Sequence, residues 1–261
     1  MLECKPCDTP VVKESRASIH NGVLLENPAE YRTLVGSLQY LTMTRPDIAF
    51  GFNYVSQFMH APTDIHFLLV KRILRYLKGT IGLGLTLRKG DLSSVKAYID
   101  SDWAGCPDTR RSTSDYAVFI GSSLICWSSK KQPTVSRSSA EAEYKRLSAA
   151  ASELEWLSNV FKELHTSVNL SMQVFCDNTS AICLASNPVF HARAKHIEVQ
   201  YHVARDRDCV HLFFFIASSI FGDTSSAAVE DLECQHSSCI ACEEELSADN
   251  NFVLFSGLAF Q

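Results

Sequence analysis

The pattern of hydrophobic and polar residues changes once along the chain, from a helical period to a strand period. Residues 1–30 show no regular pattern, whereas residues 31–90 repeat their apolar positions every three or four residues, most clearly from Asp64 to Lys78. From Val95 onward, apolar and polar residues alternate, which is typical of a strand with one buried face. The change predicts a helical segment over residues 31–90, followed by a domain that contains a sheet.

The pattern of residues over 91–208 predicts a mixed α/β domain. After the strand at Val95, we expect two strands joined by a Gly121-Ser122 turn, a long helix after Ser138, a fourth strand and two further helices. Apart from the long helix, their expected ranges are Ser114–Ile120, Ser123–Ser128, Met172–Cys176, Asn178–Ala185 and Lys195–Asp206. Three strands followed by alternating helices and a strand are typical of an α/β fold.

Charge is distributed unevenly along the chain. The formal net charge is −5, yet residues 209–261 contain eight acidic residues and no Lys or Arg. Residues 1–208 therefore hold 24 basic and 21 acidic residues, so this part of the chain is mildly basic and compatible with a nucleic-acid partner. We expect the acidic, Cys-containing tail over 209–261 to be irregular, with a zinc site at Cys234, His236, Cys239 and Cys242 as a minor alternative.

The chain shows no targeting or membrane segment. The longest apolar run, His211–Phe221, is shorter than the ~20 residues that a membrane helix needs. The first residues contain an acid and Cys4 where a secretory signal has a basic start and an apolar run. We therefore expect an intracellular protein, cytoplasmic or nuclear, with no membrane partner.

Three acidic residues stand out by their positions. Asp100 and Asp177 each end a short apolar-alternating strand, and parallel neighbouring strands would bring them to one edge of the sheet. Glu143 lies on the apolar stripe of the long helix, where a carboxylate is costly to bury without a cationic partner. The alternatives are that strand-end aspartates only form turns and that Glu143 meets solvent and complements the helix dipole.

The neighbouring Glu141 has a structural interpretation instead. Ser138 and Glu141 have the spacing of a capping box, in which each side chain accepts from the other residue's backbone N–H.

Asp100, Glu143 and Asp177 would repel one another without a cation, and oxygen ligands suit Mg²⁺ or Mn²⁺. Two such ions about 3.5–4 Å apart support phosphodiester hydrolysis.

At these residues the sequence resembles the ribonuclease H domain of copia-type retrotransposon Pol polyproteins. The segments that carry the resemblance are AYIDSDWAG (97–105), RRSTSDYAVF (110–119), ICWSSKKQPTVSRSSAEAEY (125–144), VFCDNTSAI (174–182) and NPVFHARAKHIEVQYH (187–202). Upstream, residues 31–50 and 71–80 are similar to the segment that links the polymerase to its nuclease in these polyproteins. The resemblance implies a ribonuclease H-like mixed sheet with flanking helices, preceded by a small helical segment.

The resemblance also implies a function and its residues. The metal-binding, catalytic acids of the family correspond to Asp100, Glu143 and Asp177, with Asp102 in a supporting role. The implied reaction is hydrolysis of the RNA strand of an RNA–DNA hybrid with Mg²⁺ or Mn²⁺ in a two-metal site and no small-molecule cofactor. The basic residues implied near the hybrid backbone, whose alternative role is solubility, are Lys130, Lys131 and Arg137.

The sequence departs from the family in several places. The polymerase's catalytic segment is absent, Asp115 stands where the family usually has Gly, and Arg146 where it usually has Ala. The match ends near Asp208, before the family's final strand and a further acidic residue. We expect the domain to lack that strand, although the apolar run at 211–216 is able to form an edge strand.

The missing acid bears on activity. Glu198 is a tentative replacement whose neighbours favour a structural role. Without a further carboxylate the second ion would be held weakly, so the alternative function is a catalytically inactive nucleic-acid-binding remnant.

Overall fold

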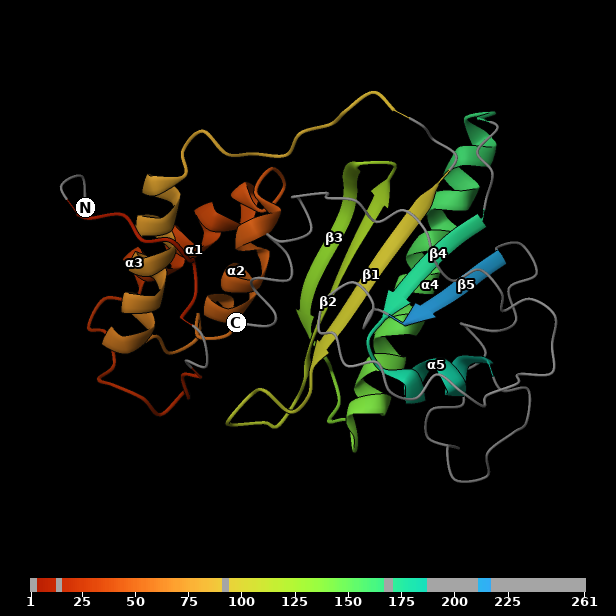
Figure 1. Cartoon of the computed structure of the whole chain (residues 1–261). Coiled ribbons are helices and arrows are strands. Elements are labelled where there is room, and N and C mark those ends of the chain that lie inside the picture. The colour runs from red at the N-terminus through yellow and green to blue at the C-terminus, as the bar shows by residue number, and fades with distance from the viewer. Residues whose placement is uncertain (1–3, 13–15, 91–93, 167–170, 187–210, 217–261) are drawn as a thin grey trace, which may run out of the picture.

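The fold combines a helical segment with a five-stranded mixed sheet (Figure 1). The computed structural model describes residues 4–12, 16–90, 94–166, 171–186 and 211–216. The helical segment contains α1 (Ala29–Leu41), the short 3₁₀ helix η1 (Pro46–Ile48), α2 (Ala49–Ser56) and α3 (Asp64–Gly79). The remaining elements are β1 (Val95–Asp102), β2 (Thr113–Ile120), β3 (Ser123–Lys131), α4 (Ser139–Glu163), β4 (Ser171–Cys176), α5 (Thr179–Ser186) and β5 (His211–Ile216).

The helical segment has its own core, which includes Tyr31, Val35, Val55, Val70 and Ile73. All five side chains are almost fully buried, so the apolar stripe predicted over residues 31–90 does face an interior. Helix α2 is short, because it begins after the 3₁₀ turn η1 and ends at Ser56.

A buried ion pair holds the break between α1 and α2. Arg45 Nη2 lies 2.7 Å from Asp47 Oδ2, which also accepts a hydrogen bond from the Tyr76 hydroxyl of α3 at 2.8 Å. The guanidinium further donates to the Thr80 carbonyl oxygen at 2.9 Å. The pair thus ties the turn between two helices to the end of α3.

The strand order in the sheet is β3-β2-β1-β4-β5. β1, β2 and β3 are antiparallel, and β4 and β5 run parallel to β1. Helix α4 lies across one face of the sheet (Figure 1), and its Tyr144, Leu147 and Leu154 pack against Ala97 and Val118 in the main core. The α/β class predicted from the element order is confirmed.

The other face of the sheet contacts the helical segment near β3. Ala117, Phe119 and Leu124 form a smaller apolar cluster there. Trp127 Nε1 donates to the Thr42 carbonyl oxygen at 3.1 Å, and Lys131 Nζ donates to Gln57 Oε1 at 3.0 Å. The two parts of the chain are therefore joined by direct polar contacts as well as by the connecting segment.

The C-terminal limit of the sheet differs from the prediction. The final strand was expected to be missing and residues 209–261 to be irregular, yet β5 pairs with β4 over six residues from His211 to Ile216. The physical reason is that the run HLFFFI is apolar and rich in residues that favour strands, so it can extend an open sheet edge. The sheet therefore extends past residue 208, and the run at 211–216 forms the edge strand that the sequence analysis allowed.

Other predictions fall on residues that the structure does not describe. These are the helix over 195–206, the tentative Glu198 and the Cys/His cluster over 234–242. Within the described residues, no helix is both long and apolar enough to cross a membrane.

Candidate metal centre

Two acidic residues reach the same edge of the sheet because their strands are parallel neighbours. In the register of β1 and β4, Tyr98 lies opposite Phe175. Asp100 and Asp177 each follow two residues later in their strand direction, so both lie at the carboxyl edge. The structure therefore contains the parallel pairing of these two strands that the sequence analysis considered.

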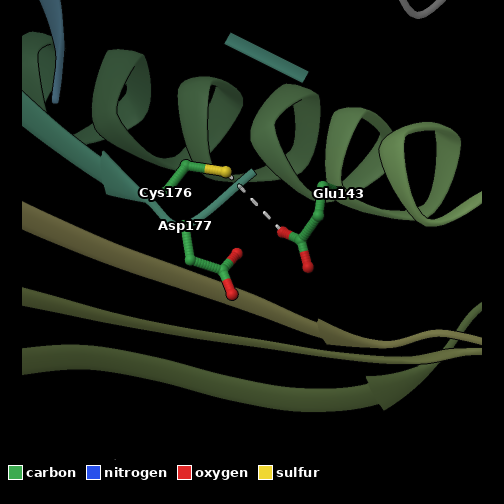
Figure 2. Close-up of side chains that lie close together, drawn as sticks. All are labelled: Glu143, Cys176 and Asp177. Atoms are coloured by element: carbon green, nitrogen blue, oxygen red, sulfur yellow. Dashed lines mark hydrogen bonds between the residues drawn. The ribbon is translucent and has the colours of Figure 1, made fainter. Parts of the chain in front are cut away.

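Glu143 approaches this edge from α4. It is 4% exposed, so the alternative in which it meets solvent at the helix start is wrong. Ligand atoms of Glu143, Cys176 and Asp177 all lie within 4.8 Å of one another, and Figure 2 shows the two carboxylates on the same side of the β4 end. Asp100 is not a member of this group. Its charge nevertheless raises the pKa of Glu143, and the charge of Asp177 raises the pKa of Asp100.

Burial and the repulsion between neighbouring carboxylates dominate the electrostatics of these groups. Burial, followed by the charges of Asp100 and Asp177, raises the pKa of Glu143 to about 9. Burial, followed by the charges of Asp115 and Asp177, raises the pKa of Asp100 to about 7. Burial also raises the pKa of Asp177. The buried carboxyl groups of Asp100 and Glu143 therefore resist ionisation unless a cation compensates the charge, whereas Asp177 is exposed to solvent.

The donor set fits a hard divalent cation. Carboxylate oxygens are the ligands that Mg²⁺ and Mn²⁺ prefer. The nearby Cys176 thiol donates to Glu143 Oε2 at 3.9 Å, and burial together with the charge of Glu143 raises its pKa to about 12. Cys176 is therefore a neutral and buried neighbour at ordinary pH.

A polar network fixes the start of α4 against the sheet, and its central residue is Gln132. Gln132 Nε2 donates to Ser114 Oγ at 2.6 Å and to the Ala142 carbonyl oxygen at 3.0 Å, while Gln132 Oε1 accepts from Ser136 Oγ at 2.8 Å. The contact with Ala142 positions the residue immediately before Glu143. Sequence reasoning missed Gln132, because nothing in its local pattern marks a buried amide.

The predicted capping box is confirmed on one side only. Ser138 Oγ accepts from the Glu141 backbone N–H at 3.2 Å, as expected for an N-cap. The Glu141 carboxylate accepts from the Arg137 backbone N–H at 2.9 Å and pairs with Lys145 Nζ at 2.8 Å, rather than forming the expected bond to Ser138. Its role is still structural.

The other predicted site residues lie around the centre in different settings. Asp102 Oδ1 pairs with Arg16 Nη2 at 3.0 Å, so a residue of the N-terminal segment reaches the end of β1. Lys130 and Arg137 are exposed. Lys131 is half-buried, and its ammonium lies 2.7 Å from Cys106 Sγ, so it is engaged inside the protein. A role for these basic residues in nucleic-acid binding stays a prediction.

The raised pKa values predict how stability depends on pH without divalent cations. The pKa of Asp100 rises from its ordinary 3.8 to about 7 in the folded chain, and the pKa of Glu143 rises from 4.5 to about 9. Between the ordinary and the raised pKa values, the folded chain therefore binds more protons than the unfolded chain does. Their contribution to stability is complete below the ordinary pKa values and is lost as the pH rises through the raised ones. We expect the Tm of the metal-free chain to fall between roughly pH 5 and pH 8, and added Mn²⁺ to reverse the loss at the higher pH.

Thermal unfolding of the wild type and of Glu143→Gln across this range checks the expectation. The amide cannot ionise, so the variant should show a shallower fall. Equal slopes in the two proteins would contradict the assignment of the effect to Glu143.

Comparison with known proteins shows similarity to transposon polyproteins. The chain is 47% identical over 207 residues to the retrovirus-related Pol polyprotein from transposon RE2 of Arabidopsis thaliana. The matched region covers 79% of this chain and 14% of that protein. The chain is also 38% identical over 215 residues to the retrovirus-related Pol polyprotein from transposon TNT 1-94 of Nicotiana tabacum, and this match covers 79% of this chain and 16% of that protein. The solved structure of LC11-RNase H1, isolated from compost, is 15% identical, has a TM-score of 0.36, and covers 47% of this chain and 83% of that one. No family model matches the chain.

The part of the chain that contains the sheet is an α/β domain with a mixed five-stranded sheet. Over 79% of its length the chain is similar to retrovirus-related Pol polyproteins from transposons, in agreement with its resemblance to the copia-type family. It spans about 14% of the length of the first curated relatives that it matches.

Proposed function

We propose that this chain is a metal-dependent nuclease that hydrolyses the RNA strand of RNA–DNA hybrids. The observation that carries the proposal is the meeting of strand-end and helix carboxylates at one edge of the sheet, with Glu143 and Asp177 in mutual reach and Asp100 coupled to them by charge. The family supports it, because a Pol polyprotein that copies RNA into DNA produces such hybrids.

In this function Asp100, Glu143 and Asp177 would hold Mg²⁺ or Mn²⁺. Such a cation would lower the pKa of a bound water and stabilise negative charge on the leaving oxygen. The chain's own residues provide the positions: parallel pairing of β1 and β4 places the two aspartates, and burial of Glu143 on α4 fixes the third carboxylate. The Gln132 network prevents the start of α4 from shifting away from the sheet.

Basic side chains near the same edge would contact the backbone of the hybrid. Arg137 precedes α4 and is exposed, and Lys130 is exposed near the end of β3. Their charge would contribute a salt-dependent part of the affinity without reading the base sequence.

Incubation of the full chain with a labelled RNA–DNA hybrid tests the proposal. We expect RNA-strand cleavage with Mg²⁺ or Mn²⁺, no cleavage with a chelator, and no cleavage of duplex DNA of the same sequence. A folded chain that binds the hybrid but leaves it intact under all metal conditions would support the alternative, an inactive nucleic-acid-binding remnant. A folded chain that neither binds nor cleaves would overturn both.

A further inference from the structure

Trp103 is an exposed aromatic residue at the carboxyl end of β1. It is 49% exposed and directly follows Asp102, the last residue of that strand. Three residues of extended chain span at most about 11 Å, so Trp103 is anchored within this distance of Asp100. The mechanism described above gives this side chain no role.

The indole of Trp103 is held in a fixed orientation. Its Nε1 atom donates to the Ser136 carbonyl oxygen at 3.1 Å, which ties the loop after β1 to the segment between β3 and α4. Figure 1 shows the segment between β1 and β2 at the same end of the sheet as the start of α4. The bond uses the only polar atom of the indole, so the exposed remainder is apolar ring surface. A ring that is already fixed loses little conformational entropy when a ligand covers it.

The basic residues beside this ring are exposed. The Ala104 backbone N–H donates to Ser112 Oγ at 3.0 Å, which brings the neighbouring residues Trp103 and Arg111 to the same part of the loop. Arg137 directly follows the residue that accepts the indole N–H. In the described part of the chain, the three ion pairs within 4.0 Å include none of the exposed residues Arg110, Arg111 and Arg137.

The acidic residues of the same loop are already engaged by the N-terminal segment. Asp102 Oδ1 pairs with Arg16 Nη2 at 3.0 Å. Asp108 accepts from the Ile19 backbone N–H at 2.9 Å and from the Ser18 hydroxyl. The remaining surface presents an apolar ring among exposed guanidinium groups. Such a surface is complementary to a sugar–phosphate backbone, because guanidinium groups bind phosphate and an apolar ring packs on a sugar.

We propose that Trp103 packs against a sugar ring of the RNA–DNA hybrid next to the metal centre, while Arg111 and Arg137 bind the neighbouring phosphates. The inference rests on the proposed function, because it names a contact that holds the substrate of that function. Trp103 is therefore a substrate-binding residue that takes no part in bond cleavage. Contacts to sugar and phosphate position a duplex without reading its bases, so the affinity should be independent of base sequence.

Binding of a labelled hybrid to the full chain with a chelator present, followed by fluorescence anisotropy, tests the inference without cleavage. We expect Trp103→Ala to weaken binding roughly fivefold, as burial of about half an aromatic side chain contributes a factor of this order. Its dependence on salt concentration should be unchanged. Arg111→Gln should instead reduce the slope of log Kd against log salt concentration by roughly 0.7–0.9, for one lost phosphate contact. Trp156→Ala, which removes an exposed indole from α4, should bind as the wild type does.

Tryptophan fluorescence gives a second readout with variants that keep an aromatic ring. Addition of the hybrid should change the emission of the wild type and of Trp156→Phe. The emission of Trp103→Phe should stay unchanged, because the indole at the contact is absent. This variant should still bind the hybrid more tightly than Trp103→Ala does.

The outcomes separate the two proposals. If folded Trp103→Ala binds as tightly as Trp156→Ala, or if the hybrid changes the emission of Trp103→Phe as much as that of the wild type, the inference is overturned. Circular dichroism checks folding, and if Trp103→Ala does not fold, the emission of Trp103→Phe decides.

Weakened binding by Trp103→Ala without any cleavage by the wild type would uphold the contact and refute the nuclease. Cleavage by the wild type with undiminished binding by Trp103→Ala would do the reverse. A folded wild type that does not bind the hybrid would overturn both proposals.

Discussion

Asp100→Asn is expected to lower cleavage of an RNA–DNA hybrid at least about 100-fold, since loss even of groups outside the ligand shell costs roughly 10–100-fold. The amide is nearly the same size as the carboxylate, but it has one charge less for a divalent cation. Asp100 is also the residue that connects the other acids electrostatically, because its charge acts on Glu143 while Asp115 and Asp177 act on it. The loss should appear in kcat at saturating hybrid, measured by single-turnover cleavage with Mg²⁺.

The same substitution should leave the metal-free chain folded or more stable. Burial and neighbouring negative charges make an ionised Asp100 costly, so removing its charge relieves repulsion at neutral pH. Glu163→Gln is the matched control, and it should cleave at the wild-type rate. Wild-type cleavage by folded Asp100→Asn would show that the reaction does not use this centre.

Leu154→Ala is expected to destabilise the chain by about 2–5 kcal/mol, the usual cost of removing a buried leucine side chain. Leu154 is 0% exposed and lies in the core between α4 and the sheet. The substitution removes apolar contacts and leaves a cavity that the regular packing of helix on sheet cannot easily close. Denaturant unfolding should show a lower midpoint with an unchanged slope.

Trp156 provides the comparison on the same helix. It is 58% exposed, so Trp156→Ala should change stability by only about 0.5 kcal/mol or less, despite the larger side chain removed. An equal loss in the two variants would contradict the assignment of the buried face of α4. The pair thus tests the orientation of the helix that carries Glu143.

Several elements were predictable because their signals are local. Alternation from Val95 and the three-to-four-residue repeat in α4 depend only on which face of each element is apolar. β3 runs three residues beyond its predicted end at Ser128, because pairing with β2 continues to Lys131 although the local sequence becomes polar. The edge strand β5 lies outside the predicted domain, because it depends on the open edge of β4 as well as on its own residues.

By itself, the sequence determined the α/β class, placed Glu143 on the apolar stripe of the long helix, and placed Asp100 and Asp177 near the carboxyl ends of two strands, because these follow from local periodicity. Tertiary structure alone decided which groups meet: the Cys176 thiol beside Glu143, the Gln132 contact at the start of α4, and the pairing of Asp115 with Asp100. The physical reason is that strand register and helix docking bring together residues that are distant in sequence. No local pattern of apolar and polar positions encodes which of them become neighbours.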